Sequence, residues 1–456
     1  MTVAAAPIEN ENYLKKVREQ YENYPYPSVD PEWEYQAPRI PVTESFELLN
    51  HVCFGGRKDF RKEFRALVAG GGTGDAAVAL AEQLRDTGNE VVYVDMSEAS
   101  MKIAQQRAQN RGLTNIRWIR DSLLNIPKMN LGQFDYINCS GVLHHLTDPD
   151  GGLKILSDAL KEDGAMGVMV YAKYGRMAVY MMQDLLRMLN RDEPNLQKQV
   201  DSARKILSNL PVSHWMFHSS QMIKDEVNIG GDVGIYDLLL HTQDRSYSIP
   251  ELYDFTRKAG LNVLRFYSDY QNISHRIYDP SFYISDVRLL DKIEKMPAEK
   301  QHALAELLYS KIEKHTVHLV KKMPIAPSID DLDMIPCMGF SLHAYPKDIS
   351  AMISNSGQVV ELRQPINDMQ VQFPNAPQLA AIWAQINNQK TLREIFRAVM
   401  DASKDKSVNF QTLAVQFKPC YDALNRIGWL FLRHKNTMPI AYPEVMQKRI
   451  PKRKTV

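Results

Sequence analysis

The sequence predicts an α/β protein whose parallel sheet is covered by helices on both faces. Two observations lead to this fold class. Between residues 64 and 171, short apolar runs alternate with segments whose apolar residues recur at helical spacing. Each helical segment also ends in a glycine, which favours a helix stop. A repeated strand–helix–strand order joins parallel strands and places helices on both sides of their sheet.

Five apolar runs are expected to be buried strands, and they read FRALVAG, EVVYVDM, NIRWIRD, FDYINCSGVL and GAMGVMVYA. The amphipathic helices among them are AAVALAEQLRDTG, SMKIAQQRAQNRG and GGLKILSDALKEDG. A long helical stretch then interrupts this rhythm, and SIPELYDFTRKAGLNVLRFYSD returns to a helix followed by a strand. We therefore expect one sheet domain at residues 61–275, with a helical insertion at about 176–235.

The segment before the sheet, residues 1–60, is rich in tyrosine and proline and centres on YENYPYPSVDPEWEYQAP. Its prolines exclude a long helix, so we expect an extended arm after a short helix over residues 13–21. The arm could close over a site as a lid. Alternatively, it could pack on the back of the sheet.

The chain beyond the sheet is predicted to be mostly helical. Residues 276–345 are expected to form a helical connector that includes AEKQHALAELLYSKIEKHTVHLVKK. Residues 346–456 are expected to form a small accessory domain with a basic tail, QKRIPKRKTV. From Gly357 to His434 the predicted order is strand, helix, helix, helix, strand, which resembles a winged-helix unit. Such units serve protein contacts or dimerisation, so a homodimer is among the expected arrangements.

Composition and charge exclude several classes of protein. Lysine plus arginine number 55 and aspartate plus glutamate 54, giving a net charge of +1, so a nucleic-acid partner is not expected. Four dispersed cysteines without a CxxC pair argue against a disulfide scaffold and a structural metal site. No apolar run approaches roughly 18 residues, and the start lacks a signal-peptide pattern. We therefore expect a cytoplasmic protein without a membrane partner.

Residues 66–75 read ALVAGGGTGD and place Gly70, Gly72 and Gly74 at the end of a strand. Glycines there allow a sharp turn and let a ligand lie against bare backbone. The next strand ends in Asp95, about 20 residues further on, where an acid can accept both ribose hydroxyls of a nucleoside. Asp121 ends the third strand, where it could accept from an adenine amino group.

These motifs, together with VDMSEASMKIA, RDSL and FDYINCSGVLHHLTDP in this order, resemble class I S-adenosylmethionine-dependent methyltransferases. The resemblance covers residues 64–171 and extends to 236–270. It implies S-adenosyl-L-methionine as cofactor, with the three glycines under its methionine part and Asp95 on its ribose. It also implies Met96 beside the adenine, Asp121 at the adenine edge, and Ser140 on the methyl-donor side.

Two departures from the family pattern are informative. In the family, an acid commonly stands two places before the first glycine and helps to hold the amino end of the cofactor. In this sequence that position is Val68. Asp75 lies close by in the sequence. The fourth strand also lacks the Asp/Asn-Pro-Pro-Tyr signature of enzymes that methylate adenine or glutamine nitrogens. These two acceptors are therefore not expected.

Methyl transfer is an in-line displacement, so the enzyme mainly positions the nucleophile and needs a base only where a proton must leave. The candidate catalytic residues are His241, in a loop with Asp244, Arg245 and Tyr247, then His145 at the tip of the fourth strand, and Tyr24 of the arm. A structural hydrogen-bond network is the alternative for the His241 loop, and buried or capping histidines are the alternative for His144 and His145. Acceptor pockets often begin after the fifth strand, where four polar side chains stand: Tyr171, Lys173, Tyr174 and Arg176.

The predicted activity is therefore methyl transfer to an oxygen or nitrogen of a small-molecule acceptor. The layout of a core, an insertion and an accessory module is also similar to bacterial protein-lysine methyltransferases such as those of rickettsiae, which makes a protein acceptor the first alternative. A non-catalytic scaffold or assembly factor that binds the cofactor is the second alternative.

Overall fold

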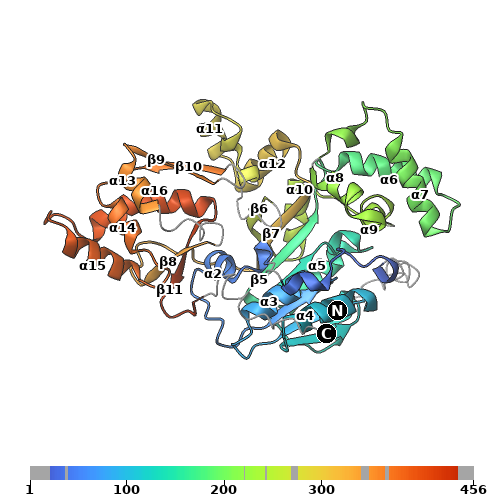
Figure 1. The fold of residues 1–456 in the computed structure, drawn as a ribbon, viewed down its shortest axis with the longest axis horizontal. Coiled ribbons are helices and arrows are strands. Elements are labelled where there is room, and N and C mark those ends of the chain that lie inside the picture. Colours follow the sequence, from blue (N-terminus) through green and yellow to red (C-terminus); the bar gives the residue numbers. More distant parts are fainter. Residues whose placement is uncertain are drawn as a thin grey trace, which may run out of the picture.

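The computed structural model describes residues 21–35, 40–219, 221–241, 244–268, 276–339, 349–364 and 369–439. Figure 1 shows three parts in a row: a helical insertion, the central sheet with its helices, and a C-terminal unit on the opposite side from the insertion. Among the described residues, we find no helix with the length and apolar character needed to cross a bilayer.

The central sheet has seven strands in the order β3-β2-β1-β4-β5-β7-β6. Its strands are β1 (Ala66–Ala69), β2 (Val91–Asp95), β3 (Ile116–Arg120), β4 (Phe134–Ser140), β5 (Leu160–Tyr171), β6 (Asn262–Tyr267) and β7 (Lys314–Val320). The first five strands pair in parallel, as the sequence predicts, whereas β7 runs antiparallel to both β5 and β6. The predicted Rossmann-like sheet is thus confirmed.

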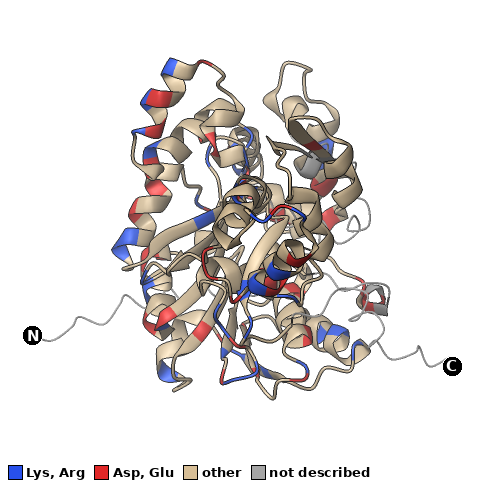
Figure 2. Cartoon of the chain, turned by 90° about the vertical axis from the view of Figure 1, so that its left-hand side faces the viewer, with Lys and Arg blue, Asp and Glu red and all other residues tan. Residues whose placement is uncertain are grey.

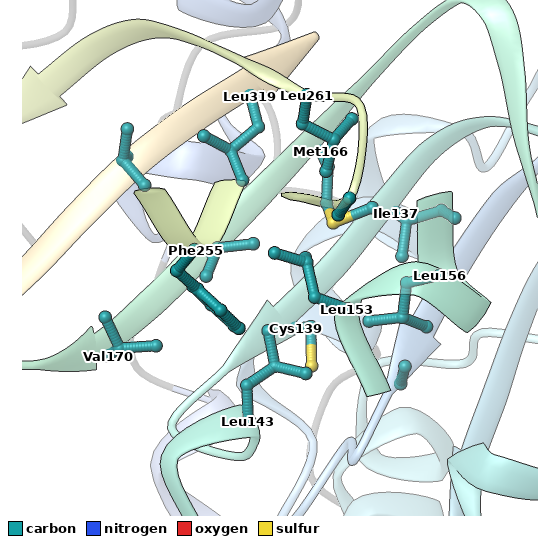
Figure 3. Close-up of a cluster of buried hydrophobic side chains, with 14 of the residues drawn as sticks. Ile137, Cys139, Leu143, Leu153, Leu156, Met166, Val170, Phe255, Leu261 and Leu319 are labelled. Carbon is teal, nitrogen blue, oxygen red and sulfur yellow. The ribbon is translucent and has the colours of Figure 1, made fainter. Parts of the chain in front are cut away.

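Alternate residues of the strands feed two apolar layers, because successive side chains point to opposite faces. Leu67 and Ala69 join the layer under α5 (Pro149–Ala159) and α10 (Ile249–Lys258). Figure 3 shows part of this layer, with Leu153 and Leu156 of α5 and Phe255 of α10 packed over side chains of β4 and β5. On the other face, strand residues pack against α2 (Phe46–Cys53), α3 (Asp75–Gln83) and α4 (Glu98–Asn110).

One stretch that the sequence predicts to be helical forms a helix followed by a strand of the central sheet. The helices α11 (Val287–Glu294) and α12 (Ala298–Tyr309) form as expected, but α12 stops at Tyr309 because the next residue, Ser310, has φ +57°, and β7 follows. The predicted boundary at residue 275 is therefore wrong, because the sheet continues to Val320. Since β7 lies between β5 and β6 and is buried on both faces, its apolar residues show no alternation that would distinguish it from a helix.

The predicted insertion contains α6 (Met177–Leu189), α7 (Leu196–Ser208), α8 (Gln221–Asn228) and α9 (Gly231–Ile235), and a π-helical turn at Tyr236–Leu240 follows them. These elements share an apolar core of their own. The insertion is therefore a packed helical layer beside the sheet.

The C-terminal unit has its own core and two antiparallel strand pairs. Its elements are β8 (Met334–Met338), α13 (Ile349–Asn355), β9 (Val359–Gln364), β10 (Met369–Pro374), α14 (Leu379–Gln385), α15 (Leu392–Ala402), α16 (Phe410–Arg426) and β11 (Leu430–His434). The predicted three helices and final strand are present, but the predicted order omitted β10. The winged-helix interpretation stays a prediction, and the basic tail lies outside the described residues.

Positive and negative side chains are interspersed along the helices in the view of Figure 2. This distribution agrees with the balanced net charge. Within the described ranges, no group of three or more His, Cys, Asp or Glu side chains has the geometry of a metal site.

Candidate active site

A cavity of about 380 Å³ lies at the carboxyl ends of β1, β2 and β4. Ligands of open α/β sheets bind at this edge, because the loops there leave a crevice. The cavity walls come from four parts of the chain: the glycine loop, the turns after β2, β3 and β4, the arm at residues 21–27, and the insertion.

All seven residues predicted to bind the cofactor line this one cavity, and they are Gly70, Gly72, Gly74, Asp95, Met96, Asp121 and Ser140. Gly70 has φ +75°, and a Cβ there would lie 2.4 Å from Cγ2 of Val142. Gly72 has φ +50°, and its Cβ would lie 3.0 Å from the carbonyl oxygen of Tyr26. The loop therefore requires glycine both for its backbone conformation and for space.

The two predicted acids have defined local partners. Asp95 accepts hydrogen bonds from the backbone N–H of Gly72 and of Ser97, both at 2.8 Å, and burial raises its pKa. Asp121 accepts from the backbone N–H of Ser122 and from Asn125, both at 2.7 Å. Asp95 thus holds the glycine loop in shape. This bare-backbone cradle with acids at successive strand ends fits a nucleoside ligand.

The arm forms one wall of the cavity. Its Tyr21, Tyr26 and Pro27 line the cavity directly. The carboxylate of Glu22 accepts from the N–H groups of Glu98 and Ala99 at the start of α4, at 2.7 and 3.1 Å, and an acid is favourable at a helix N-terminus. The Thr73 hydroxyl donates to Pro27 O at 2.9 Å, and the Tyr26 hydroxyl donates to Glu226 at 2.8 Å. The arm is therefore fastened to the glycine loop on one side and to the insertion on the other.

Tyr24, predicted as catalytic, is not among the residues that line the cavity. Its ring stacks on Tyr236, with ring centroids 5.1 Å apart, and packs against the core of the insertion. The structure therefore places Tyr24 as a packing residue, and its neighbours Tyr21 and Tyr26 reach the cavity instead. A sequence of closely spaced tyrosines does not show which ring points to which side.

The two predicted catalytic histidines lie together, but only His145 reaches the cavity wall. His241 is 2% exposed and stacks behind His145, with ring centroids 3.8 Å apart. His144 is buried between His145 and Tyr171, and burial lowers its pKa well below the usual value, which keeps the ring neutral. His145 is thus the one histidine of this cluster that a ligand could touch.

The charged residues of the His241 loop contact two different parts of the structure. Asp244 accepts a hydrogen bond from Gln183 of α6 at 2.9 Å, whereas the Arg245 guanidinium lies over the ring of Tyr247, 4.9 Å from its centroid. Of the residues predicted after β5, Tyr171 and Arg176 line the cavity, while Lys173 forms an exposed ion pair with Glu251.

Three acidic residues that the sequence analysis did not single out, Glu226, Asp237 and Glu313, also line the cavity. Asp237 is 6% exposed, and its Oδ2 accepts from the Tyr171 hydroxyl at 3.4 Å. Among the described residues, its Oδ1 has no hydrogen-bond partner. Burial and the nearby Glu226 raise the pKa of Asp237 to about 7, although the Arg176 guanidinium opposes this shift.

A further missed acid, Glu44, enters the cavity wall from the turn η2 (Val42–Glu44). Its side chain is buried, and burial raises its pKa to about 7. None of these four acids belongs to a sequence motif. Only the tertiary fold brings them to the edge of the sheet, so a single sequence carried no signal for them.

A family model described as a methyltransferase domain matches residues 67–166. An uncharacterized protein of Synechococcus sp. is 28% identical over 330 residues, which are 72% of this chain and 75% of that protein. The ubiquinone/menaquinone biosynthesis C-methyltransferase UbiE of Shewanella oneidensis is 25% identical over 156 residues, 32% of this chain. The match spans 61% of the length of that relative.

Among solved structures, PKMT2 from Rickettsia typhi has a TM-score of 0.58 at 15% identity, covering 88% of this chain and 77% of that chain. A structure of PKMT2 in complex with AdoHcy has a TM-score of 0.56 at 14% identity, covering 88% of this chain and 76% of that chain. At this identity the likeness is one of fold, and its extent reaches far beyond residues 67–166.

Proposed function

We propose that this chain, which is a class I S-adenosylmethionine-dependent methyltransferase, methylates an amine nitrogen and that this amine is a lysine side chain of a protein. The observation that carries the proposal is the set of four carboxylates in the cavity wall, above all Oδ1 of Asp237, which has no hydrogen-bond partner among the described residues. An anionic, desolvated wall favours a cationic group over a neutral oxygen acceptor.

The chemistry needs a nucleophile with a free electron pair. When bound, S-adenosylmethionine supplies an electrophilic methyl group on a sulfonium sulfur. An amine that enters as an ammonium must therefore lose a proton before its nitrogen can attack. Asp237 Oδ1 is the proposed acceptor of that proton, because a carboxyl with a pKa of about 7 is well matched to a reaction near neutral pH.

The tyrosines of the cavity would orient the amine. The Tyr171 hydroxyl lies 3.4 Å from Asp237, and the Tyr26 hydroxyl donates to Glu226. Arg176 is the opposing charge in this wall. Its guanidinium lies 3.5 Å from the centroid of the Tyr171 ring and 4.0 Å from the buried Asp244, so part of its charge is already balanced.

A protein acceptor is supported by the parts of the chain outside the sheet. The likeness in fold to PKMT2 covers 88% of this chain, so it includes the surroundings of the sheet as well as the cofactor cradle. The layout of a sheet domain, an insertion and a C-terminal unit is also similar to that of rickettsial protein-lysine methyltransferases. The insertion, which contributes Ile223 and Glu226 to the cavity wall, offers surface on which a protein acceptor could dock.

A small-molecule acceptor is the second candidate. It is favoured by the similarity to UbiE, whose name describes a C-methyltransferase of quinone biosynthesis. The match covers 32% of this chain, so most of the chain has no counterpart in that similarity.

The test incubates the protein with methyl-labelled S-adenosylmethionine and an extract of source cells, then separates products by size. We expect label in a protein band, and methyl-lysine in that band by mass spectrometry. The Asp237→Asn variant should lose about 100-fold in rate, since general-base contributions are of this order. Asp184→Asn is the matched control, because Asp184 stands on the exposed side of α6 and pairs with Arg187. Label confined to the low-mass fraction would contradict the protein acceptor, and full activity of Asp237→Asn would contradict the role of that residue.

A further inference from the structure

Val68 occupies the position where the family pattern has an acid, and it has a polar neighbour in β4, the strand beside β1 in the sheet. Val68 of β1 is paired in register with Asn138 of β4. Side chains of residues paired in this way point to the same face of a sheet. Asn138 therefore stands beside the place where the family pattern has a carboxylate.

A carboxylate does reach this place, but it comes from a different part of the chain. Glu44 Oε1 accepts a hydrogen bond from Asn138 Nδ2 at 2.6 Å, and the Tyr136 hydroxyl lies 2.9 Å from the same oxygen. Oε2 accepts from the Thr43 hydroxyl at 3.1 Å. The backbone of Glu44 is fixed as well, because Gln83 of α3 donates to its carbonyl oxygen at 2.7 Å.

The carboxylate also faces the ligand cavity. Glu44 and Asn138 line it together with Gly70, Gly72 and Ser140. The other acid at this end of the cavity, Asp75, already has a positive partner, because it lies 2.7 Å from the guanidinium of Arg107. The hydrogen bonds to the Glu44 carboxylate come from three neutral groups, Thr43, Tyr136 and Asn138. A buried anion with neutral partners lacks a compensating positive charge.

We propose that Glu44 takes the place of the acid missing at Val68 and binds the ammonium group at the methionine end of S-adenosylmethionine. The turn η2 thus supplies to the glycine loop, from outside the sheet, the group that the loop itself lacks. A ligand ammonium would bring the charge that the neutral partners cannot supply. This inference concerns cofactor binding and does not depend on the acceptor. It is therefore tested, and can fail, independently of the proposed lysine substrate.

The test measures binding by titration calorimetry, without any acceptor. The two ligands are S-adenosylhomocysteine, which carries the ammonium, and 5′-methylthioadenosine, which lacks the amino-acid end. We expect Glu44→Gln to weaken S-adenosylhomocysteine at least tenfold and to leave methylthioadenosine within twofold of the parent. Asp95→Ala should weaken both ligands, because its carboxylate is on the nucleoside side. Glu306→Gln, which changes a buried glutamate on α12 that does not line the cavity, should weaken neither.

Proton release gives a second readout that a merely structural role would not change. Burial raises the pKa of Glu44 to about 7, so part of the population is protonated at pH 7. An ammonium bound beside it would favour the ionised form and release protons to the buffer. Calorimetry in buffers of different ionisation enthalpy should show this release in the parent and its loss in Glu44→Gln. Glu44→Asp keeps the charge and should bind S-adenosylhomocysteine more tightly than Glu44→Gln. This second variant keeps the proposal testable if Glu44→Gln folds poorly. Equal losses for the two ligands, or no loss for either, would overturn the proposal.

Discussion

At the scale of single residues, the burial of Asp237 sets a pH range for catalysis. Its raised pKa of about 7 means that the proton-accepting carboxylate predominates above pH 7 and is lost below it. We therefore expect kcat/KM to fall as pH decreases from 8 to 5.5, approaching about tenfold per pH unit well below the pKa. The residual activity of Asp237→Asn should lack this limb. A pH–rate profile of both proteins measures it, and an unchanged profile in the variant would assign the limb to another group.

Sequence motifs identified the cavity residues that stand at strand ends, but not the acids that reach the cavity from other parts of the chain. The glycines, Asp95 and Asp121 all stand at the ends of adjacent strands, so their meeting follows from the order of strands alone. Glu44 and Asp237 come from a turn before the sheet and from the insertion. Their convergence depends on packing between distant segments, which local patterns do not encode.

At the scale of elements, α4 connects the arm to the glycine loop through a buried arginine. Arg107 bonds to Glu34 of η1 (Pro31–Tyr35) at 2.7 Å, to Asp75 at 2.7 Å and to the carbonyl oxygen of Thr73 at 2.8 Å. One side chain therefore holds η1 of the arm, the start of α3 and the end of the glycine loop together. Removing it would leave the buried Glu34 with Arg111 as its remaining cation and would break the ion pair of the partly buried Asp75.

We expect Arg107→Met to lower the free energy of unfolding by about 3–5 kcal/mol, the range for breaking a buried ion pair by removal of one partner. Arg120→Met is the matched control. Its guanidinium is 46% exposed and pairs with Glu98 at the surface, so the change should cost less than about 1 kcal/mol. Urea unfolding of the two variants gives the comparison. Equal losses for both would mean that the buried cluster adds nothing beyond a surface pair.

The strands and helices differ in how far the sequence predicted them. Five parallel strands and the insertion helices followed from alternation, amphipathic spacing and glycine stops. β7 did not, because KHTVHLV lies directly after a helix and is buried on both faces. Its two histidines also interrupt the apolar run that would indicate a buried strand. Both are buried, and His315 and His318 lie 2.9 and 3.1 Å from Tyr247 O and Thr43 O. Only the sheet partners β5 and β6 supply that context.

At the scale of the whole molecule, the sheet domain and the C-terminal unit meet through a small apolar seam. Val42, Leu48, Tyr267 and Phe431 form this cluster, which is separate from the cores on either side. Beside it, the neutral ring of His51 joins the two parts, since Leu432 N–H donates to its Nδ1 at 3.0 Å. Burial lowers the pKa of His51 to about 4, so this joint keeps its hydrogen bond at neutral pH. The two parts are therefore expected to unfold together.

The seam and the cavity share the turn η2, because Val42 packs in the seam and Glu44 lies in the cavity wall. Phe431→Ala should lower the free energy of unfolding by about 3–5 kcal/mol, as a large buried side chain is lost. The affinity for S-adenosylhomocysteine should nevertheless stay within twofold. The reason is that η2 keeps its other attachments: Gln83 to the carbonyl oxygen of Glu44, and His318, whose Nε2 lies 3.1 Å from Thr43 O.

Urea unfolding and calorimetry on the same preparations separate the two effects of this change. Val415→Ala is the control, because Val415 is 67% exposed on α16 and should change stability by less than about 0.5 kcal/mol. An unchanged unfolding midpoint in Phe431→Ala would show that the seam does not couple the two parts. A large loss of affinity would show instead that η2 depends on the C-terminal unit for its position. The hydrogen bonds to η2 come from α3, β4 and β7, all within the sheet domain, and they are what favours stability loss without affinity loss.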